Sequence, residues 1–432
     1  NSYVAQGKSV LIVSHSNVSV DGVIKQVVKM LGTDKQSILE DGKILRFGYV
    51  RDDELSQNPY AASFNYALSK CDSYARQLEH LMAKRDELRA KNQMKSKEYD
   101  EVEHKIKEIR GEIRKEERKY VERAQVIGTT ISRATIDPMF EERQFDLVMF
   151  DEVSMAYVPQ VIAAAALAKE KFMCVGDFRQ LAPISQSPDS RVLQVDIFSY
   201  LQIVDGKGNM YWHPWLVMLN EQRRMAPAIS EFPSKFIYNR LLKDNAEVIN
   251  GKKKRDNDLV IKSAPLPGDA LNLIDLAGTY CAADKNTDGS RFNILSAVIS
   301  FSTAVKAEQN HIETIGIITP YAAQVRLIRA MLKDYYTKGT THVSCATVHQ
   351  FQGSESDVIV FDAVESYPKS AVGYLMGKEP NQVARLINVA ITRGKGKVIT
   401  VANARFWENV FKGTNHIFYK LLQHIKNGKH QV

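Results

Sequence analysis

The chain has 432 residues, of which 44% are hydrophobic and 25% charged, so its length allows two or three globular domains. It contains no run of about 18 apolar residues, so we expect no membrane-spanning helix. The 4 cysteines are far apart and form no CxxC pair, so we expect neither a zinc site nor a disulfide framework, and we predict a cytoplasmic location, or a nuclear one in a eukaryote. The net charge of +8 is compatible with nucleic acid as a partner.

The N-terminal segment predicts a buried strand at Val10–Val13, followed by a helix that ends near Leu31. Gly7-Lys8-Ser9 looks like the end of a phosphate-binding loop. However, the position where this loop needs an earlier glycine holds Ser2, and a strand follows instead of a helix. We therefore find no phosphate cradle in the chain. The polar residues from Ser14 to Asp21 fit a strand-to-helix cap, with a ligand-contacting loop as the alternative.

A long charged stretch from Ala61 to Ala124 follows a short predicted strand at Ile44–Val50. Apolar residues recur in it at heptad spacing, in two arms joined by the polar stretch from Arg89 to Lys97. This pattern predicts an antiparallel helical hairpin, a coiled coil, inserted at residues 54–125 with arms of roughly 35–40 Å at about 1.5 Å per residue. Its charges fit a solvated surface, and an arm that binds a protein partner or separates nucleic-acid strands is the alternative.

The stretch from Phe145 to Gln180 predicts two neighbouring strands with acidic residues at their ends. The first apolar run, Leu147–Phe150, ends in Asp151-Glu152. The second, Phe172–Val175, is followed by Asp177 and Gln180. In open α/β sheets ligands bind at the carboxyl ends of the strands, where two acids can hold Mg²⁺ and orient a water. The stretch therefore predicts the hydrolytic half of a nucleoside triphosphatase, with a solvent-facing acid pair as the alternative.

The second half of the chain alternates strands with helices, which predicts a second parallel sheet. We expect Lys252–Asn257 to form a basic loop and a helix near Phe418–Ile425 to close the chain. The predicted division is 1–215 for the first domain, including the hairpin, and 216–432 for the second. The strands expected in the second domain are Leu273–Asp275, Ile315–Ile318, Val358–Phe361 and Val398–Val401.

The order and spacing of eight segments are more specific than any one of them. These segments are Ser14–Asp21, Gly128–Thr130, Asp151–Ser154, Gly176–Pro183, Gln222–Pro227, Thr319–Gln324, Thr347–Asp357 and Asn388–Arg393. Together they resemble the motifs of superfamily 1 helicases, most closely the branch (superfamily 1B type) that includes the nonsense-mediated-decay RNA helicase.

The resemblance implies an α/β fold of two tandem RecA-like P-loop domains with parallel sheets, with the hairpin inserted in the first. It implies an ATP-dependent 5′-to-3′ helicase or translocase on single-stranded DNA or RNA, which uses ATP and Mg²⁺ and couples hydrolysis to domain closure. We expect the family's first strand and Walker A loop upstream of Asn1. The alternatives are an ATP-switched nucleic-acid-binding scaffold, a pseudo-helicase, or the motor module of a larger nuclease or defence assembly.

The resemblance also implies roles for single residues around the nucleotide. Asp151 would hold Mg²⁺, Glu152 would activate the attacking water, and Gln180 would sense the γ-phosphate. Arg224 and Arg393 would reach the γ-phosphate from the second domain, where a guanidinium stabilises charge on the transferring phosphoryl group. The residues implied to line the nucleotide side of the cleft are Gly353 and Glu355.

A further set of residues is implied to follow the nucleic-acid backbone: Ser16, Asn17, Thr130, Thr319, Pro320, Tyr321 and Thr347. For Tyr321 a base-stacking platform and a packing residue at a helix start are both alternatives. The sequence departs from the family pattern at Arg223, where a tyrosine is usual, and at His349, where an aspartate is common. None of the departures removes a charge that hydrolysis needs.

Overall fold

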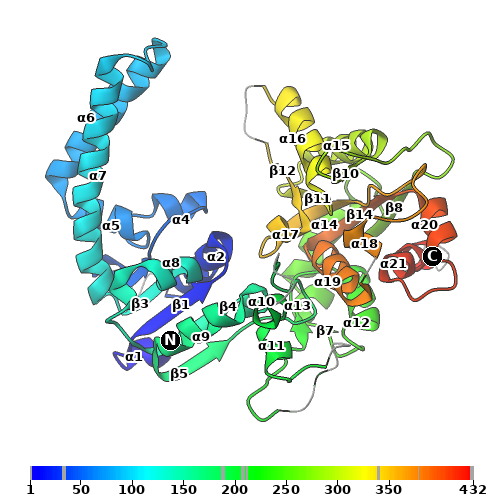
Figure 1. The fold of residues 1–432 in the computed structure, drawn as a ribbon, viewed down its shortest axis with the longest axis horizontal. Helices are drawn as coiled ribbons and strands as arrows, with labels where there is room; N and C mark the ends of the chain where they lie inside the picture. The colour runs from blue at the N-terminus through cyan, green and yellow to red at the C-terminus, as the bar shows by residue number, and fades with distance from the viewer. Residues whose placement is uncertain are drawn as a thin grey trace. The chain divides into compact units, whose positions relative to one another are not determined.

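The computed structural model describes residues 2–31, 36–185, 190–205, 210, 213–337, 341–377 and 379–428. The chain divides into two compact units (Figure 1). Unit 1 consists of Asn1–Asp177 and Pro183–Tyr200, and unit 2 consists of Phe178–Ala182 and Leu201–Val432. Each unit is described by itself, and the predicted division after residue 215 stays a prediction. None of the helices in the described ranges combines the length and the apolar character that crossing a bilayer requires.

Unit 1 is built on a 5-stranded parallel sheet with the order β2-β3-β1-β4-β5. Its strands are β1 (Val10–Ser14), β2 (Ile44–Arg46), β3 (Val126–Thr130), β4 (Phe145–Asp151) and β5 (Ala168–Cys174). Helix α2 (Asn17–Leu31) packs on one face through Val20 and Ile24, because Gly128 of β3 has no side chain to hold it away. The predicted parallel sheet is confirmed. Strand β2 is shorter than expected, since backbone carbonyls just after it bond the Arg46 side chain instead of a neighbouring strand.

The predicted hairpin lies between β2 and β3, which are neighbours in the sheet, so it is an insertion in one crossover connection. Helix α6 (Asp72–Ala90) runs antiparallel to α7 (Lys97–Arg123), as the Arg89 Nε to Tyr99 Oη hydrogen bond of 2.9 Å shows. The first arm is broken at Lys70, so a separate α5 (Ser63–Ser69) precedes α6. Apolar residues from both arms form a core of their own around Ile106 and Ile113.

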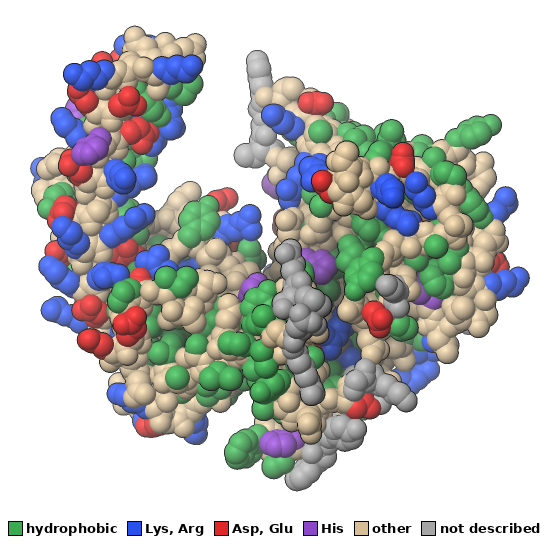
Figure 2. Space-filling model, in the orientation of Figure 1, with side chains coloured by type: hydrophobic (Ala, Val, Ile, Leu, Met, Phe, Trp, Pro, Cys, Tyr) green, Lys and Arg blue, Asp and Glu red, His purple; other side chains and the backbone are tan. Residues whose placement is uncertain are grey.

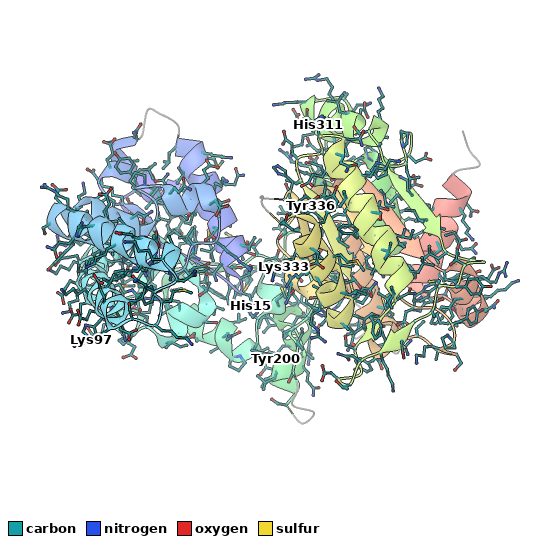
Figure 3. The ribbon with its side chains drawn as sticks, turned by 90° about the horizontal axis from the view of Figure 1, so that it is seen from above. His15, Lys97, Tyr200, His311, Lys333 and Tyr336 are labelled. Atoms are coloured by element: carbon teal, nitrogen blue, oxygen red, sulfur yellow. The ribbon has the colours of Figure 1, made fainter. Side chains whose placement is uncertain are left out.

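Basic and acidic side chains are interspersed over the outside of the hairpin (Figure 2). Lys97 marks the start of α7 at its tip (Figure 3). Ion pairs such as Lys84 to Glu98, with 2.7 Å between nitrogen and oxygen, join the two arms at their exposed surface. This pattern fits a solvated surface, whereas coiled-coil packing of the arms stays a prediction.

Unit 2 holds a second 5-stranded parallel sheet with the order β12-β11-β13-β14-β8. Its strands are β8 (Leu271–Asp275), β11 (Ile315–Thr319), β12 (Val343–Thr347), β13 (Ser356–Asp362) and β14 (Gly394–Ala402). The main helices of the unit are α12 (Pro227–Phe236), α14 (Lys252–Lys262), α15 (Ile294–Gln309), α16 (Ala322–Tyr335), α19 (Pro380–Ile391) and α21 (Ile417–Gly428). The second parallel sheet is thereby confirmed as well.

The basic loop expected at Lys252–Asn257 is wrong, because these residues form the first part of α14. Asn257 is buried, and Gly396 of β14 lies so close to α14 that a Cβ there would be 2.6 Å from Val260. The buried Lys397 ammonium donates to the Ser263 carbonyl at the end of α14, at 2.5 Å. The basic side chains thus lie on the outer face of a helix whose inner face packs on the sheet.

Candidate nucleotide and nucleic-acid site

The carboxyl ends of three strands in unit 1 bring predicted site residues to one edge of the sheet. Ser14, the last residue of β1, is paired in register with Thr130 of β3 on one side and with Asp151 of β4 on the other. His15 follows at the same edge (Figure 3). The acids and the polar loop after β1 therefore lie side by side, as parallel strands require.

The acidic turn after β4 has an unusual backbone. Glu152 has a φ of 54°, the left-handed region that non-glycine residues rarely adopt. The turn is fixed from the next strand, since the Val153 amide donates to the Val175 carbonyl at 3.0 Å. Gly176 lies close beneath it, and a Cβ there would be 3.1 Å from the Ser154 nitrogen. Backbone strain of this kind persists only where neighbouring structure holds it, and it clusters at functional sites.

The electrostatics of the acid pair fit a divalent cation. Burial, together with the neighbouring Glu152 carboxylate, raises the pKa of Asp151 to about 6. Within the described residues no group of three or more His, Cys, Asp or Glu side chains is placed to hold a metal. Mg²⁺ usually takes only one or two protein carboxylates and completes its shell with water and substrate phosphates. Asp151 is therefore suited to bind a Mg²⁺ ion whose other ligands are water and the phosphates of a nucleotide.

The polar residues predicted to follow nucleic acid in unit 1 have structural partners. Ser16 Oγ accepts the Ser19 amide at 3.1 Å and caps α2, while Thr130 Oγ1 accepts the Arg133 amide at 3.3 Å. Asn17 Oδ1 accepts from Arg46 Nη2 at 2.8 Å. The cap interpretation of this segment is what the structure shows, and contact with nucleic acid stays a prediction.

Sequence reasoning missed the buried ion pair that supports this loop. Arg46 Nε donates to Asp21 Oδ1 at 2.6 Å, and both side chains are at most 2% exposed. The second Asp21 oxygen accepts the backbone amides of Arg51 at 2.6 Å and Asp52 at 3.1 Å. The pair therefore ties α2, β2 and the loop after β2 together and holds Asn17 in place. Nothing in the local pattern of β2 signals that its last residue points into the interior.

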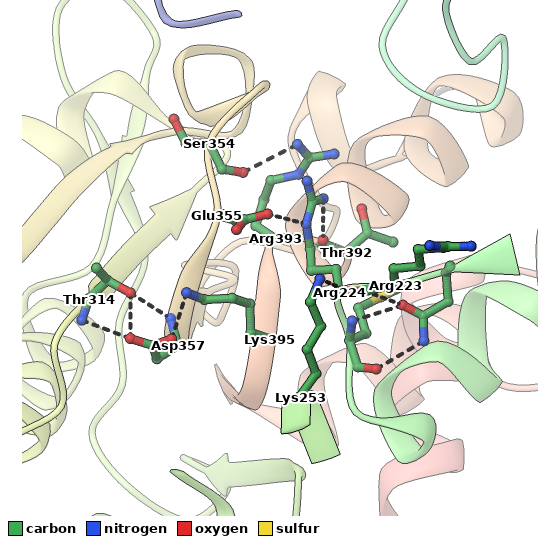
Figure 4. A network of polar contacts seen from close by, with 12 residues as sticks. Arg223, Arg224, Lys253, Thr314, Ser354, Glu355, Asp357, Thr392, Arg393 and Lys395 are labelled. Atoms are coloured by element: carbon green, nitrogen blue, oxygen red, sulfur yellow. Dashed lines mark hydrogen bonds and ion pairs between the residues drawn. The ribbon is translucent and has the colours of Figure 1, made fainter. Parts of the chain in front are cut away.

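In unit 2 the residues predicted to meet the nucleotide lie together before the amino ends of β13 and β14 (Figure 4). Arg224 Nε donates to Glu355 Oε2 at 2.6 Å, and Arg224 Nη1 donates to the Thr392 carbonyl at 3.1 Å. Both side chains of this ion pair are partly exposed. Gly353, nearby in the chain, has a φ of 83°, so this turn requires a residue without a side chain.

Arg393 completes this cluster and is only 2% exposed. Its Nη2 donates to Gln180 Oε1 at 3.1 Å, and its Nη1 donates to the Ser354 carbonyl at 3.3 Å. Gln180 belongs to the short segment Phe178–Ala182, which follows β5 in the chain but packs as part of unit 2. The structure thus brings together the predicted sensor glutamine, both predicted arginines and Glu355.

A second polar cluster beside the arginines was not predicted. Lys395 Nζ pairs with Asp357 Oδ1 at 2.7 Å, and the other Asp357 oxygen accepts the Thr314 hydroxyl at 2.7 Å. These contacts tie together the starts of β13, β14 and β11 (Figure 4). Lys395, two residues after Arg393, was the available signal, but only the fold shows its partner.

The remaining predicted residues lie at the opposite, carboxyl edge of the same sheet. Thr319 of β11 is paired in register with Thr347 of β12. Thr347 caps the short helix α17 (Val348–Phe351). Pro320 is buried, and Tyr321 is only 5% exposed and donates its hydroxyl to Glu365. The structure thus shows Tyr321 as a packing residue at a helix start, and its contact with nucleic acid stays a prediction.

Comparison with known proteins finds relatives over nearly the whole chain. Two family models, each described as an AAA domain, match residues 1–188 and 209–405. The DNA polymerase alpha-associated DNA helicase A of Schizosaccharomyces pombe is 29% identical over 343 residues, which are 76% of this chain and 48% of that protein. The protein of the same name from Saccharomyces cerevisiae is 27% identical over 91% of this chain and 58% of its own length.

A third relative comes from the branch implied by the sequence. The regulator of nonsense transcripts 1 homolog of Neurospora crassa is 26% identical over 323 residues, which are 73% of this chain and 27% of that protein. The chain spans about half the length of the first two relatives, with 48% and 58% of their residues matched.

Proposed function

The chain belongs to the superfamily 1 helicases, in the branch that includes the nonsense-mediated-decay RNA helicase, and we propose that it is the motor part of an ATP-dependent helicase or translocase. The track is single-stranded DNA or RNA, and movement is 5′ to 3′, as the family resemblance implies. The observation that carries the proposal is the cluster of Gln180, Arg224, Glu355 and Arg393 in unit 2. The two arginines of this cluster carry the type of side chain that binds phosphate groups most specifically.

Each residue has a chemical task in this proposal. Asp151 holds the Mg²⁺ ion, and Glu152 accepts a proton from the attacking water. Arg224 and Arg393 stabilise the charge that develops on the phosphoryl oxygens, for which arginines are worth about 10³–10⁵ in rate. Bound ATP with its Mg²⁺ supplies the phosphoryl group that is transferred. We further propose that hydrolysis is coupled to closure of the two units on each other.

In the structure both arginines already have protein partners. The guanidinium groups of Arg224 and Arg393 donate to the Glu355 and Gln180 side chains and to three backbone carbonyls. A phosphate must therefore replace these partners, so the arginines exchange one set of oxygen acceptors for another. Because the exchange keeps each guanidinium satisfied, it avoids the cost of leaving a charged group unpaired.

The test is ATP hydrolysis by the full-length protein, including the upstream sequence, with and without single-stranded DNA or RNA. We expect nucleic acid to raise the rate, and Glu152→Gln to abolish the stimulated activity. The matched control is Glu170→Gln, which changes an exposed glutamate of β5. A rate of ATP hydrolysis that neither DNA nor RNA changes would overturn the motor proposal. Tight binding of nucleic acid without strand displacement would favour the scaffold alternative.

We also propose that the hairpin at residues 61–124 is a docking arm for a protein partner. Its exposed charges and its own small core support this role. The start of the segment meets the sheet of unit 1, where the Ala61 carbonyl accepts the Arg46 amide of β2 at 2.7 Å. Deleting Ala61–Ala124 should leave ATP hydrolysis intact while weakening partner binding or strand separation. Equal loss of hydrolysis and unwinding would show that the arm is only structural. The cytoplasmic or nuclear location of the protein stays a prediction.

A further inference from the structure

The carboxyl edge of the unit 2 sheet carries an exposed aromatic residue close to the buried Tyr321. Tyr374 begins the short helix α18 (Tyr374–Gly377, labelled in Figure 1). Its side chain is 62% exposed. Tyr321 has no such surface, because it is 5% exposed and its hydroxyl donates to Glu365. Most of the Tyr374 side chain is therefore exposed to solvent, whereas almost none of the Tyr321 side chain is.

A single buried carboxylate connects the two tyrosines. Glu365 is 1% exposed, and it accepts hydrogen bonds from the Tyr321 hydroxyl, from Arg291 Nη1 and from the Gly373 amide at 2.8 Å. The same Arg291 nitrogen also donates to the Ala371 carbonyl at 3.0 Å. The residue directly before Tyr374 is thus held by the carboxylate that holds Tyr321.

Gly373 permits this close approach. A Cβ on Gly373 would lie 2.5 Å from the Tyr321 hydroxyl oxygen and 3.0 Å from Glu365 Oε1. The first distance is shorter than real Cβ contacts and the second is tighter than most, so a side chain at position 373 would require Tyr321, Glu365 or the backbone before α18 to shift. Close packing against Tyr321 and Glu365 therefore favours glycine at position 373.

The backbone that delivers Glu365 is strained. Val364 has a φ of 65°, which is an outlier for a β-branched residue, and the Glu365 amide donates across it to the Ala363 carbonyl at 2.7 Å. The turn is clamped from both sides, because the Val364 amide donates to Asp362 Oδ1 and its carbonyl accepts from Asn293 Nδ2, each at 3.0 Å. Strain held this firmly is characteristic of functional sites.

We propose that Tyr374 is a stacking platform for a base of single-stranded nucleic acid, and that Glu365 is the positioning residue that fixes it beside the Thr319–Tyr321 turn. This inference rests on the proposed function and adds one contact with the same single-stranded nucleic acid. Since β11 and β13 are parallel and paired up to Ile318 and Phe361, the residues that follow them share one edge. Stacking on an aromatic face tolerates every base, as a motor that moves along its track requires.

The first test compares Tyr374→Ala with Tyr374→Phe in the full-length protein, using fluorescence anisotropy of labelled deoxythymidine and uridine oligonucleotides. Tyr374→Ala should weaken binding about 5- to 150-fold, whereas Tyr374→Phe keeps the aromatic face and should bind normally. The slope of affinity against salt should not change, because no phosphate contact is removed. The control is Tyr335→Ala, an exposed tyrosine at the other end of α16.

The second test reads stacking directly, with 2-aminopurine placed in the oligonucleotide as a fluorescent base. Stacking on Tyr374 should quench its emission in the wild-type protein and in Tyr374→Phe, but not in Tyr374→Ala. Glu365→Gln should reduce the quenching and raise the nucleic-acid concentration for half-maximal ATP hydrolysis, with the rate at saturation retained. Tyr321→Phe removes only one donor to Glu365 and should give the same changes in weaker form, even if Glu365→Gln misfolds.

The outcomes separate this inference from the function on which it rests. A protein that binds no single-stranded nucleic acid overturns both. A protein that binds it and hydrolyses ATP in response, but whose affinity and quenching are unchanged in Tyr374→Ala, overturns the platform alone. Loss of quenching in Tyr374→Ala with full quenching in both Glu365→Gln and Tyr321→Phe overturns the positioning role of Glu365.

Discussion

Replacing Arg46 with methionine tests how the loop after β1 is held. Methionine has a similar length but no charge, so it leaves Asp21 buried beside apolar atoms. Asp21 keeps two backbone donors, the amides of Arg51 and Asp52, but loses its only ion-pair partner among the described residues. Breaking a buried pair by removing one partner costs about 3–5 kcal/mol, because the remaining charge is uncompensated. We expect a loss of that size in the stability of unit 1.

The assay must separate unit 1 from unit 2. All 3 tryptophans of the chain lie beyond residue 200, so tryptophan fluorescence during urea unfolding reports on unit 2. Amide hydrogen exchange measured on peptides from β1 and β3 reports on unit 1, because protection there follows the local free energy of opening. Arg46→Met should lower protection in β1 and β3 and leave the tryptophan transition unchanged.

The matched control is Lys8→Met, which breaks the exposed ion pair of Lys8 with Glu170. Exposed pairs contribute little, so this variant should exchange like the wild type. If Arg46→Met lowers protection no more than Lys8→Met does, then the Asp21–Arg46 pair does not hold the loop, and it does not hold Asn17 in place. The double change of Asp21 and Arg46 to leucine and methionine should recover part of the loss, since no charge then stays buried.

Three further experiments, with four variants, test other contacts. Glu355→Gln breaks a half-exposed ion pair with Arg224 and should lower the unfolding free energy of unit 2 by at most about 1 kcal/mol, measured by tryptophan fluorescence in urea; a larger loss would mean that the pair is a structural anchor. Gly128→Ala places a Cβ 2.5 Å from Ile24 and should cost unit 1 about 1–3 kcal/mol by amide exchange, whereas Gly22→Ala in α2, with nothing within 4 Å, should stabilise it by about 0.5–1 kcal/mol. Burial lowers the pKa of Lys397 to about 8 from an ordinary 10.5, so the unfolded state binds more protons between these values and stability should rise with pH there; Lys397→Met should lack this rise, and an equal rise in both proteins would contradict the assignment.

The sequence predicted the strands well because parallel strands covered on both faces are continuous apolar runs. Val10–Val13 and Val358–Phe361 are examples, and both are buried along their whole length. The hairpin was predictable for a related reason, since its apolar residues recur along one side of each arm. In these cases the apolar residues of the local sequence pattern are the residues that the folded chain buries.

Sequence reasoning was undecided for Tyr321, silent on the Arg46 ion pair and wrong for Lys252–Asn257, because contacts distant in the sequence decide each of these outcomes. The pattern that places Tyr321 after a strand says nothing of which way its ring points, and that is decided by Glu365, 44 residues later. Arg46 reads as a polar end of a strand until Asp21 is brought next to it. Lys252–Asn257 reads as a loop because its charged residues hide the one buried position, Asn257, that faces the sheet.

Strand β13 connects the two groups of predicted ligand contacts in unit 2. The Ser356 amide at its start donates to the Arg393 carbonyl at 3.0 Å, in the arginine cluster. Asp362 at its end accepts the Val364 amide at the start of the turn that carries Glu365. Seven residues of strand span roughly 20 Å, so the proposed nucleotide and nucleic-acid contacts are well separated but share one strand. If phosphate binding moved the Arg393 cluster and β13 with it, Glu365 and Tyr374 would move as well, and the proposed nucleotide contacts at one edge would be coupled to the proposed nucleic-acid contacts at the other.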